Sequence, residues 1–365
     1  MRILDRYLLR SVLVPLGYCL AAFIMLYVVF DLFNNLTDFI EGKTPLREVF
    51  LFYVILLPSV LWIIAPVSLL LSLLYALWQL ARANELTALR ACGLGFGRIM
   101  RPLLGVGLAA TIVVGVIHET IGPWSGYWTS QFVQLQHKKG ALSVNIVSPL
   151  PYKNDACHRV WMINEFNKKT YELHDVTVHQ LRADGSDEVK YQAPRGHWLD
   201  GRWWFTEVVI QRYQPNGYLA GAAEPPVLHR EMSEFTETPH DFVNEIKPPE
   251  FLSSLEILHY LRTHDQLSGK AIAERLTDLH SRLAMPWLCF IITLVGIPFG
   301  AQAGRRRGGA LTGIIGALVM FFSFYVLINF GVALGKQGAL APWLAGWLPD
   351  MVFLVLGLAL TWRLR

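Results

Sequence analysis

The sequence predicts a membrane protein of six spanning helices, with one large polar domain inserted between the third and the fourth. Three uncharged apolar runs precede residue 121, three apolar runs with one charged residue among them follow residue 282, and the stretch between them is polar. A spanning helix needs about 20 mainly apolar residues, and each run is close to or above that length. The predicted fold class is therefore membrane α-helical, in a 3+3 arrangement around an extramembrane insertion.

The first three runs are Val12–Phe30, Val49–Ala81 and Pro102–Ile117. The second would rise about 50 Å as one helix, which exceeds one bilayer core but is too short for two spans and a turn. We therefore predict a single helix there and three spans within residues 1–120. A cleaved signal peptide is the alternative for the first run, but no small-x-small cleavage site follows before Asn34.

The last three runs are Leu283–Gly304, Gly308–Gly335 and Trp343–Trp362, which place three further spans within residues 283–365. The last run contains Asp350, the one intramembrane polar residue that we single out. A carboxylate inside a membrane is costly and is usually paired or close to water. We expect Asp350 to have a structural partner or to line a wet cavity, rather than to relay protons.

Arginines gather on one side of this arrangement. Twelve of them fall before the first run, in the connections after the second and fourth runs, or at the end of the chain: Arg2, Arg6, Arg10, Arg82, Arg90, Arg98, Arg101, Arg305, Arg306, Arg307, Arg363 and Arg365. The positive-inside rule then predicts that both termini are cytoplasmic and that residues 121–282 are extracytoplasmic. These arginines also explain the net charge of +4, so nothing points to nucleic acid.

The inserted region predicts short antiparallel strands. His158–Phe166, Tyr171–Leu181, Glu188–Gln192 and Trp203–Tyr213 are rich in β-branched and aromatic residues. Asp-Gly dipeptides separate them, and the one at Asp200 predicts a tight hairpin. A sandwich or jelly roll is favoured over a helical domain. Prolines from Pro225 onward predict a loop-rich exit, and a helical segment from Ser253, interrupted at Gly269, predicts the return to the membrane.

The connection between the second and third runs carries the strongest local signal. It reads RANELTALRACGLGFGRIMR, from Arg82 to Arg101. Asn84 is placed to cap a short helix, Glu85 favours its first turn, and Gly93 is suited to end it. Such a helix of about residues 83–93 is either a docking surface for a partner or an amphipathic segment that lies in the lipid interface.

Motifs for catalysis or metal binding are scarce. His118-Glu119 opens like a zinc-protease motif, but no second histidine follows at the required spacing. A membrane enzyme that modifies envelope lipids is a weak alternative, for which Asp155, His158 and Glu165 are the available groups. We predict no catalytic residue, no metal site and no cofactor bound by this chain.

Several motifs, in this order, resemble the LptF/LptG permeases of the bacterial lipopolysaccharide exporter. They are ILDRYLLR from Ile3, NELTALRACG from Asn84, Gly122-Pro123-Trp124, SRLAMPWLCFIITLVGIPFG from Ser281 and GALAPWLAGWLPD from Gly338. The resemblance covers nearly the whole chain. It implies a non-catalytic membrane subunit of an ABC transporter in the bacterial inner membrane, and a periplasmic β-jelly-roll with a core of about residues 140–235 inside the domain 121–282.

The resemblance also implies partners. They are an LptB-type ATPase dimer that uses ATP and Mg, a second LptF/LptG-type permease, periplasmic bridge proteins of the LptC/LptA type, and lipopolysaccharide as cargo. Glu85 would be the carboxylate of the coupling helix, with Leu86, Leu89, Arg90 and Gly93 beside it. The first and fifth spans would form a lateral gate, where Gly313, Gly316 and Gly331 permit close helix packing.

Lipid phosphates need cations near the outer surface. The candidates are Lys43, Arg47, Arg275 and Arg282, and Arg282 is either a substrate contact or an interfacial anchor. Family members of the G type can carry a lysine near the outer end of the first helix, where this chain has Asp31, and we count Asp31 among the candidate substrate-binding residues. The assignment to the F or G type therefore stays open, and a stand-alone or paralogous transporter of another envelope lipid is the alternative function.

Overall fold

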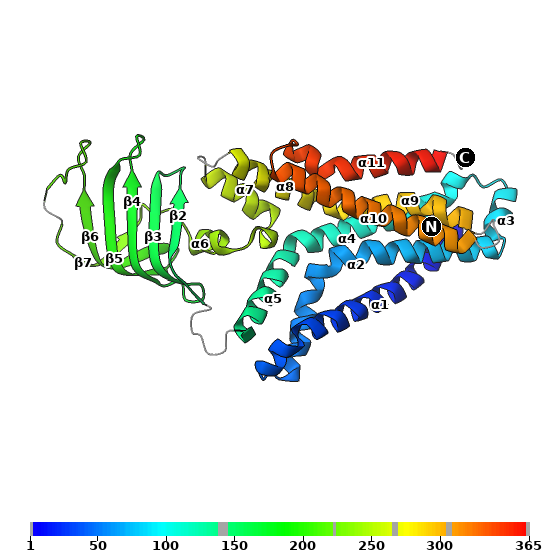
Figure 1. Ribbon diagram of the computed structural model, residues 1–365, viewed down its shortest axis with the longest axis horizontal. Coiled ribbons are helices and arrows are strands. Elements are labelled where there is room, and N and C mark those ends of the chain that lie inside the picture. The colour runs from blue at the N-terminus through cyan, green and yellow to red at the C-terminus, as the bar shows by residue number, and fades with distance from the viewer. Residues whose placement is uncertain (1–2, 138–144, 222–223, 265–268, 304–308, 363–365) are drawn as a thin grey trace. The chain divides into compact units, whose positions relative to one another are not determined.

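A computed structural model describes residues 3–137, 145–221, 224–264, 269–303 and 309–362 (Figure 1). The chain divides into two compact units, residues 1–129 with 269–365 and residues 130–268. Within the described ranges, six helical segments are long and apolar enough to span a membrane: Ile3–Glu41, Leu46–Arg82, Phe96–Thr120, Gly269–Ala301, Ile315–Lys336 and Pro342–Trp362. The prediction of six apolar helices is confirmed, whereas Arg305–Arg307 lie outside the described residues.

The helices that precede the sheet are α1 (Ile3–Glu41), α2 (Leu46–Arg82), α3 (Glu85–Ala91), α4 (Phe96–Thr120) and α5 (Gly122–His137). The prediction that Val49–Ala81 forms a single helix is confirmed, because α2 continues through Pro58 and Pro66. Helix α5 was not predicted. Its start is tied to α2, since the Ser125 hydroxyl donates a hydrogen bond to the carbonyl oxygen of Ile55.

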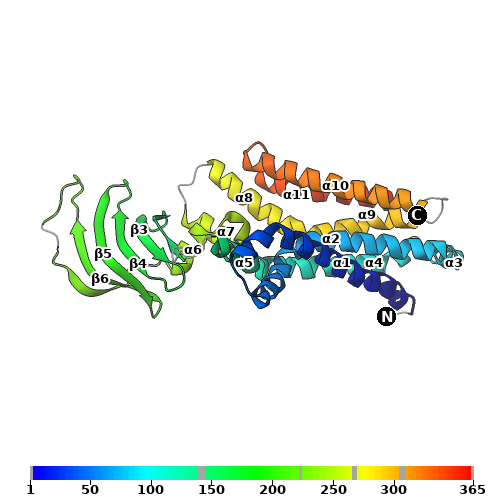
Figure 2. The ribbon, with the colours of Figure 1, turned by 60° about the horizontal axis from the view of Figure 1, so that its bottom comes forward.

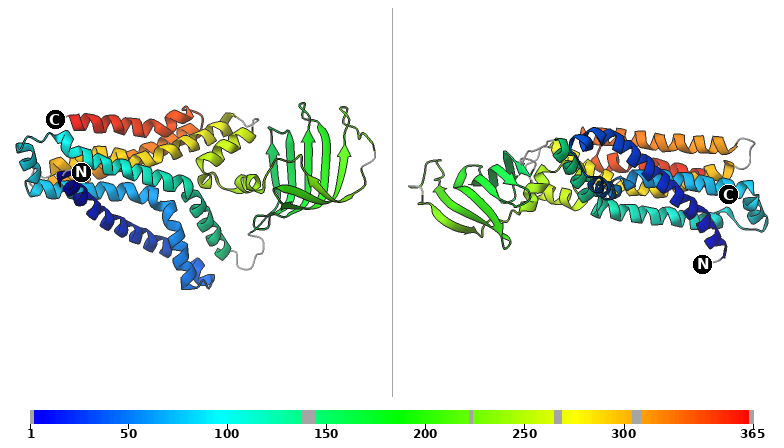
Figure 3. Two further views of the ribbon diagram at one scale, coloured as in Figure 1. Left: turned by 180° about the vertical axis from the view of Figure 1, so that it is seen from behind. Right: turned by 90° about the horizontal axis from the view of Figure 1, so that it is seen from below.

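The helices that follow the sheet are α8 (Gly269–Ala284), α9 (Leu288–Ala303), α10 (Gly309–Lys336) and α11 (Pro342–Trp362). A 3₁₀ turn, η3 (Met285–Trp287), joins α8 to α9 at Pro286, which lacks the amide proton that an uninterrupted α-helix needs. Helices α9, α10 and α11 run side by side in both views of Figure 3. Their facing side chains form an apolar core with α2, in which Phe324 and Phe353 stack edge to face.

Glycines allow the helices of this group to approach closely. A Cβ atom at Gly316 would lie 2.9 Å from Phe299 Cε1, and one at Gly331 would lie 2.7 Å from the carbonyl oxygen of Ala345. The expected close packing at these two positions is therefore present, and the neighbours of Gly313 lie outside the described residues.

The unit of residues 130–268 is built on a seven-stranded antiparallel sheet (Figure 2). Its strands are β1 (Ile146–Val147), β2 (Leu150–Asn154), β3 (Arg159–Asn167), β4 (Leu173–Leu181), β5 (Asp187–Leu199), β6 (Arg202–Arg212) and β7 (Val227–Met232). From β3 to β7 each strand pairs with the next in the chain, while β1 and β2 both pair with β3. These pairings establish an antiparallel sheet, and the two-sheet jelly roll is not confirmed by them.

The predicted hairpin at Asp200 is confirmed. Leu199 and Arg202 face each other across β5 and β6, and Asp200 and Gly201 have φ angles of 51° and 78°. Two consecutive positive φ values match the right-handed twist of the flanking strands. Glycine adopts a positive φ at little cost.

The prediction of a loop-rich exit after Pro225 is wrong. That segment contains β7, helix α6 (Pro239–Ile246) and the 3₁₀ turn η2 (Pro249–Phe251). The helical segment predicted from Ser253 is confirmed, because helix α7 (Ser254–Thr263) follows with Ser253 as its N-cap. Pro239 occupies the first turn of α6, where the missing amide proton is no loss. Phe242 of α6 is fully buried against the sheet, beside Trp161 and Trp203, so the proline-rich segment supplies part of the core.

Candidate coupling site

Helix α3 joins α2 to α4 and ends as the sequence predicts. Gly93 follows the helix with a φ of 80°, its N–H donates to the carbonyl oxygen of Arg90 at 3.0 Å, and the N–H of Leu94 donates to that of Leu89 at 3.2 Å. This pair of hydrogen bonds satisfies carbonyls that the helix leaves open. The predicted side-chain cap by Asn84 is wrong, because its left-handed backbone, with a φ of 57°, accompanies no capping hydrogen bond.

The inner face of α3 is anchored in the unit of residues 1–129 and 269–365, which we call the helical unit. Leu86 is buried in a cluster with Leu8 of α1 and Phe96 of α4, and Leu89 packs against the same cluster. Burying a leucine side chain stabilises a structure by about 1.5–3 kcal/mol, so this face holds α3 in place. The outer face exposes small side chains, namely Thr87, Ala88, Ala91 and Cys92.

Glu85 lies at the start of α3 and is tied to α1. The Tyr7 hydroxyl donates a hydrogen bond to Glu85 Oε2 at 2.6 Å. A second link lies close by in the sequence, where Arg98 Nη2 donates to both carboxylate oxygens of Asp5 at 3.1 Å. At the other end of α3, the Arg90 guanidinium lies 6.0 Å from the centre of the Phe96 ring. Helix α3 is therefore a short, firmly held element that carries a carboxylate, connected to the first turns of α1.

The predicted substrate residues fall into two groups. Lys43 and Arg47 are exposed at the turn from α1 to α2, and Asp31 lies three turns earlier on α1. Asp31 accepts a hydrogen bond from the Asn35 side chain at 3.0 Å. The second group, Arg275 and Arg282, lies two turns apart on α8, where both side chains are largely covered by protein.

Arg282 is held inside the helical unit. Its Nε donates to Glu119 Oε1 at 3.1 Å, its Nη2 donates to the carbonyl oxygen of His118 at 3.1 Å, and its side chain is only 9% exposed. The partner, Glu119, ends α4, 163 residues earlier in the chain. The geometry therefore favours the anchoring role over a substrate contact, because the charge of Arg282 is already neutralised.

A double-mutant cycle on this pair tests the anchoring role. Arg282→Gln and Glu119→Gln should each destabilise the protein, and their effects should fail to add by about 0.5–3 kcal/mol because each removes the same interaction. Chemical unfolding of the purified protein in detergent measures this energy. Arg282→Gln paired with Glu48→Gln, an exposed carboxylate in the first turn of α2, is the matched control and should be additive. Additivity in the Arg282–Glu119 cycle as well would contradict the anchoring role.

Known proteins match nearly the whole of this chain. The family model described as lipopolysaccharide export system permease LptF/LptG matches residues 6–363. The chain belongs to the LptF/LptG permease family. It is similar to the lipopolysaccharide export system permease protein LptF of Escherichia coli (strain K12) and to that of Shigella flexneri, in each case 20% identical over 98% of this chain and 94% of the relative.

An LptF/LptG permease is a transporter membrane subunit and not itself a catalyst. Among the described residues, no group of three or more histidine, cysteine or acidic side chains is placed to hold a metal ion. Asp155, one residue of the enzyme alternative, is buried and forms an ion pair with Lys153 at 2.7 Å. That pairing gives Asp155 a structural partner.

Asp350 of this LptF/LptG chain lies in α11 and is 7% exposed. Its Oδ1 atom is buried without a hydrogen-bond partner in the part of the chain that the structure describes. The predicted structural partner of Oδ1 is therefore not found there. One helical turn earlier, Gly346 packs against the backbone of α8, so Asp350 lies on a tightly packed side of α11.

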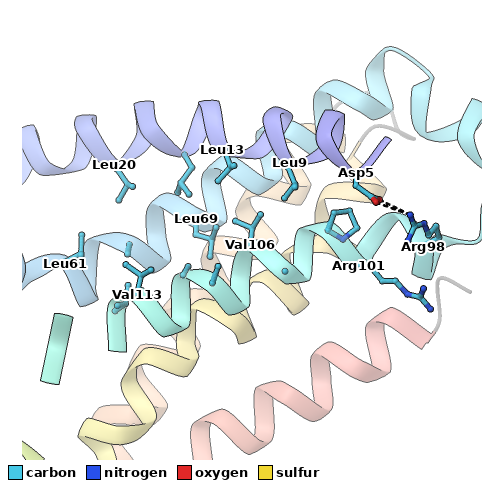
Figure 4. Close-up of a pocket in the computed structure, with 17 residues that line it drawn as sticks. Asp5, Leu9, Leu13, Leu20, Leu61, Leu69, Arg98, Arg101, Val106 and Val113 are labelled. Carbon is cyan, nitrogen blue, oxygen red and sulfur yellow. Dashed lines mark hydrogen bonds and ion pairs between the residues drawn. The ribbon is translucent and has the colours of Figure 1, made fainter. Parts of the chain in front are cut away.

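Two grooves flank α1 in this permease. One, of about 670 Å³, lies between α1, α2 and α4, and Figure 4 shows leucines of α1 facing valines of α4 across it. The other, of about 850 Å³, lies between α1 and α2 and includes Tyr7, Arg10 and Trp78. Helix α1 is thus the least enclosed of the spanning helices, with 6% of its most apolar stretch buried.

Sequence reasoning missed the residues whose hydrogen-bond partners lie far away along the chain. Tyr7 and Asp5 lie within the opening motif, yet their contacts with Glu85 and Arg98 join positions 78 and 93 residues apart. Helical spacing gives no information on such pairs. A search for unpaired charges near helix ends would have singled out Asp5, because it is the one acidic residue among the first ten.

Proposed function

We propose that this chain is one of two permease subunits of an ABC transporter that extracts lipopolysaccharide from the inner membrane. It would hand the lipid to a periplasmic bridge of β-jelly-roll proteins for export to the outer membrane. The observation that carries the proposal is helix α3, a short element with one carboxylate at the junction of α2 and α4, in a chain that matches the LptF/LptG family from residue 6 to residue 363.

Coupling to ATP hydrolysis would occur at α3. ATP and Mg would be bound by an LptB-type ATPase dimer, and Glu85 would enter a groove on that partner. Because Leu86 and Leu89 pack inward, the partner would meet Glu85, Arg90 and the small exposed side chains of the outer face. The hydrogen bond from Tyr7 to Glu85 would transmit movement of α3 to α1, which is the proposed gate helix.

The proposed orientation follows the arginines, with both termini and α3 in the cytoplasm and residues 121–282 in the periplasm. Lys43 and Arg47 are exposed at the turn that would face the periplasm, where they suit lipid phosphates. The sheet would act as the jelly roll that meets the bridge. Strand β7 supports this role, because it pairs only with β6 among the described strands and exposes Leu228, so a strand of a partner protein could extend the sheet.

The test is co-purification from native membranes, with bound proteins and lipids identified by mass spectrometry. The wild-type chain should retain an ATPase, a second permease and lipopolysaccharide. Glu85→Arg should lower ATPase recovery at least tenfold, because reversing a charge at a buried polar contact costs several kcal/mol, and 1.4 kcal/mol corresponds to a factor of ten.

Two control variants separate coupling from folding. Glu48→Arg makes the same charge change at an exposed position on α2 and should leave ATPase recovery unchanged. Tyr7→Phe removes the hydrogen bond to Glu85 but keeps its charge, so the ATPase should remain bound. A chain that is recovered alone would contradict the proposal, and recovery with the ATPase but with a different lipid would favour the alternative, a paralogous transporter of another envelope lipid.

A further inference from the structure

The groove of about 670 Å³ between α1, α2 and α4 is apolar along its length. It is lined mainly by leucine, valine and alanine side chains, including Leu13, Leu61, Ala109 and Val113. Gly105 of α4 also lines it, and a Cβ atom built there would meet no other atom within 4 Å. The groove is therefore open space and not a packed contact between the helices.

The dimensions of this groove suit one hydrocarbon chain. Along α4 it extends from Arg101 to Val114, a rise of about 20 Å. One leaflet contributes about half of a hydrocarbon core that is about 30 Å thick, so the groove spans at least the acyl region of one leaflet.

Charge is confined to one end of the groove. Figure 4 shows Asp5 and Arg98 joined at that end, with the apolar side chains beyond them, and the Arg101 side chain extending from the same end of α4 on the side away from α1. The ion pair with Asp5 neutralises Arg98. Arg101 is exposed, and the described residues provide it with no hydrogen-bond or ion-pair partner. One guanidinium whose charge no described residue neutralises therefore lies beside the end of the apolar groove, and such a group is well suited to a phosphate.

We propose that this groove binds an anionic glycerophospholipid, with one acyl chain between α1 and α4 and its phosphate on Arg101. The lipid belongs to the leaflet at the Arg101 end. In the proposed orientation that is the cytoplasmic leaflet, opposite to the leaflet from which lipopolysaccharide is extracted. The acyl chain adds to the lateral packing of α1, of whose most apolar stretch only 6% is buried.

Native mass spectrometry of the full-length protein tests this site. The protein is released from nanodiscs of phosphatidylethanolamine and phosphatidylglycerol in a 3:1 ratio, and the retained lipids are counted. The wild type should retain one phosphatidylglycerol molecule. Gly105→Leu should lower this retention at least tenfold, because its side chain extends into the open groove. Gly17→Leu is the matched control, since Gly17 is exposed on α1, has no atom near its Cβ position and lines neither groove.

A second pair of variants tests the role of the phosphate. Arg101→Gln should reduce the preference for phosphatidylglycerol over phosphatidylethanolamine at least fivefold. Arg6→Gln should preserve the preference, because Arg6 is exposed on the first turns of α1 but does not line the groove. If Gly105→Leu fails to give a monodisperse protein, Ala109→Leu fills the same groove from one turn further along α4 and carries the same expectation.

A photoreactive amino acid at Leu13 identifies the occupant directly in native membranes. Crosslinks to glycerophospholipid support the site, whereas crosslinks to lipopolysaccharide or to a second protein chain would overturn it. Equal lipid retention by the wild type and Gly105→Leu would overturn it as well. None of these measurements involves an ATPase or transport, so their outcome is independent of the Glu85 test.

Discussion

Replacing Glu237 with glutamine should lower the free energy of unfolding of the sheet-containing unit by about 3–5 kcal/mol, because it leaves the Arg159 guanidinium buried without its counter-ion. Arg159 Nη1 and Glu237 Oε2 are 2.7 Å apart, and the two side chains are 8% and 0% exposed. Asn154 donates a hydrogen bond to the other carboxylate oxygen at 2.9 Å. The carboxylate is therefore satisfied on both oxygens and is buried.

The same site connects three parts of the sheet unit. Arg159 begins β3, its Nε donates to Gln180 Oε1 of β4 at 2.9 Å, and its guanidinium lies 4.6 Å from the centre of the Phe235 ring. The backbone carbonyl of Glu237 accepts a hydrogen bond from Trp203 Nε1 of β6 at 2.7 Å. Loss of the charge on Glu237 should therefore loosen β3, β4 and β6 together.

Hydrogen exchange of the full-length protein, measured on peptides from β3 and β6, reports this local stability. Glu224→Gln is the matched control. Glu224 pairs with Arg212 at 3.3 Å, but the two side chains are 43% and 63% exposed, so its loss should cost less than about 1 kcal/mol. The double variant Arg159→Met with Glu237→Leu removes both charges and should recover most of the stability. Equal exchange in Glu237→Gln and Glu224→Gln would refute the structural role of the buried pair.

Replacing Gly346 with alanine should destabilise the helical unit by about 1–3 kcal/mol, because the added methyl group has no space. A Cβ atom at Gly346 would lie 2.7 Å from the carbonyl carbon of His280 and 2.8 Å from the amide nitrogen of Ser281. Both are backbone atoms of α8, so no side-chain rotation relieves the clash. Helices α8 and α11 would have to separate, which would also disturb the contact between Gly335 of the neighbouring α10 and Ala345 of α11.

Thermal unfolding of the purified protein in detergent measures this effect. Gly17→Ala is the control, because Gly17 has no atom within 4 Å of its Cβ position and alanine favours a helix by up to about 1 kcal/mol. Its melting temperature should equal or exceed that of the wild type, whereas that of Gly346→Ala should fall. A melting temperature for Gly346→Ala at or above the control value would show that α8 and α11 have room to adjust.

Local patterns in the sequence were sufficient for several elements. The apolar runs predicted six spanning segments, because the hydrophobicity of about 20 consecutive residues decides membrane insertion without reference to the rest of the fold. The Asp200-Gly201 hairpin and the end of α3 at Gly93 were predictable because a backbone with positive φ selects its residues locally. The proline-rich segment misled the prediction, since Pro239 starts a helix in the sheet core and does not break one.

Local sequence patterns therefore identified the helices that are apolar enough to span a membrane, the strands β3 to β6, and the end of the short helix between α2 and α4. The interaction partners of the charged side chains depend on the tertiary structure. The sequence places Arg282 near the outer surface, where it could contact substrate. In the structure it forms an ion pair with Glu119, 163 residues earlier in the chain. Glu85 likewise accepts a hydrogen bond from Tyr7. Arg101 lies at the end of the groove between α1, α2 and α4. Pairing over such distances depends on how helices pack, and no periodicity within one helix encodes it.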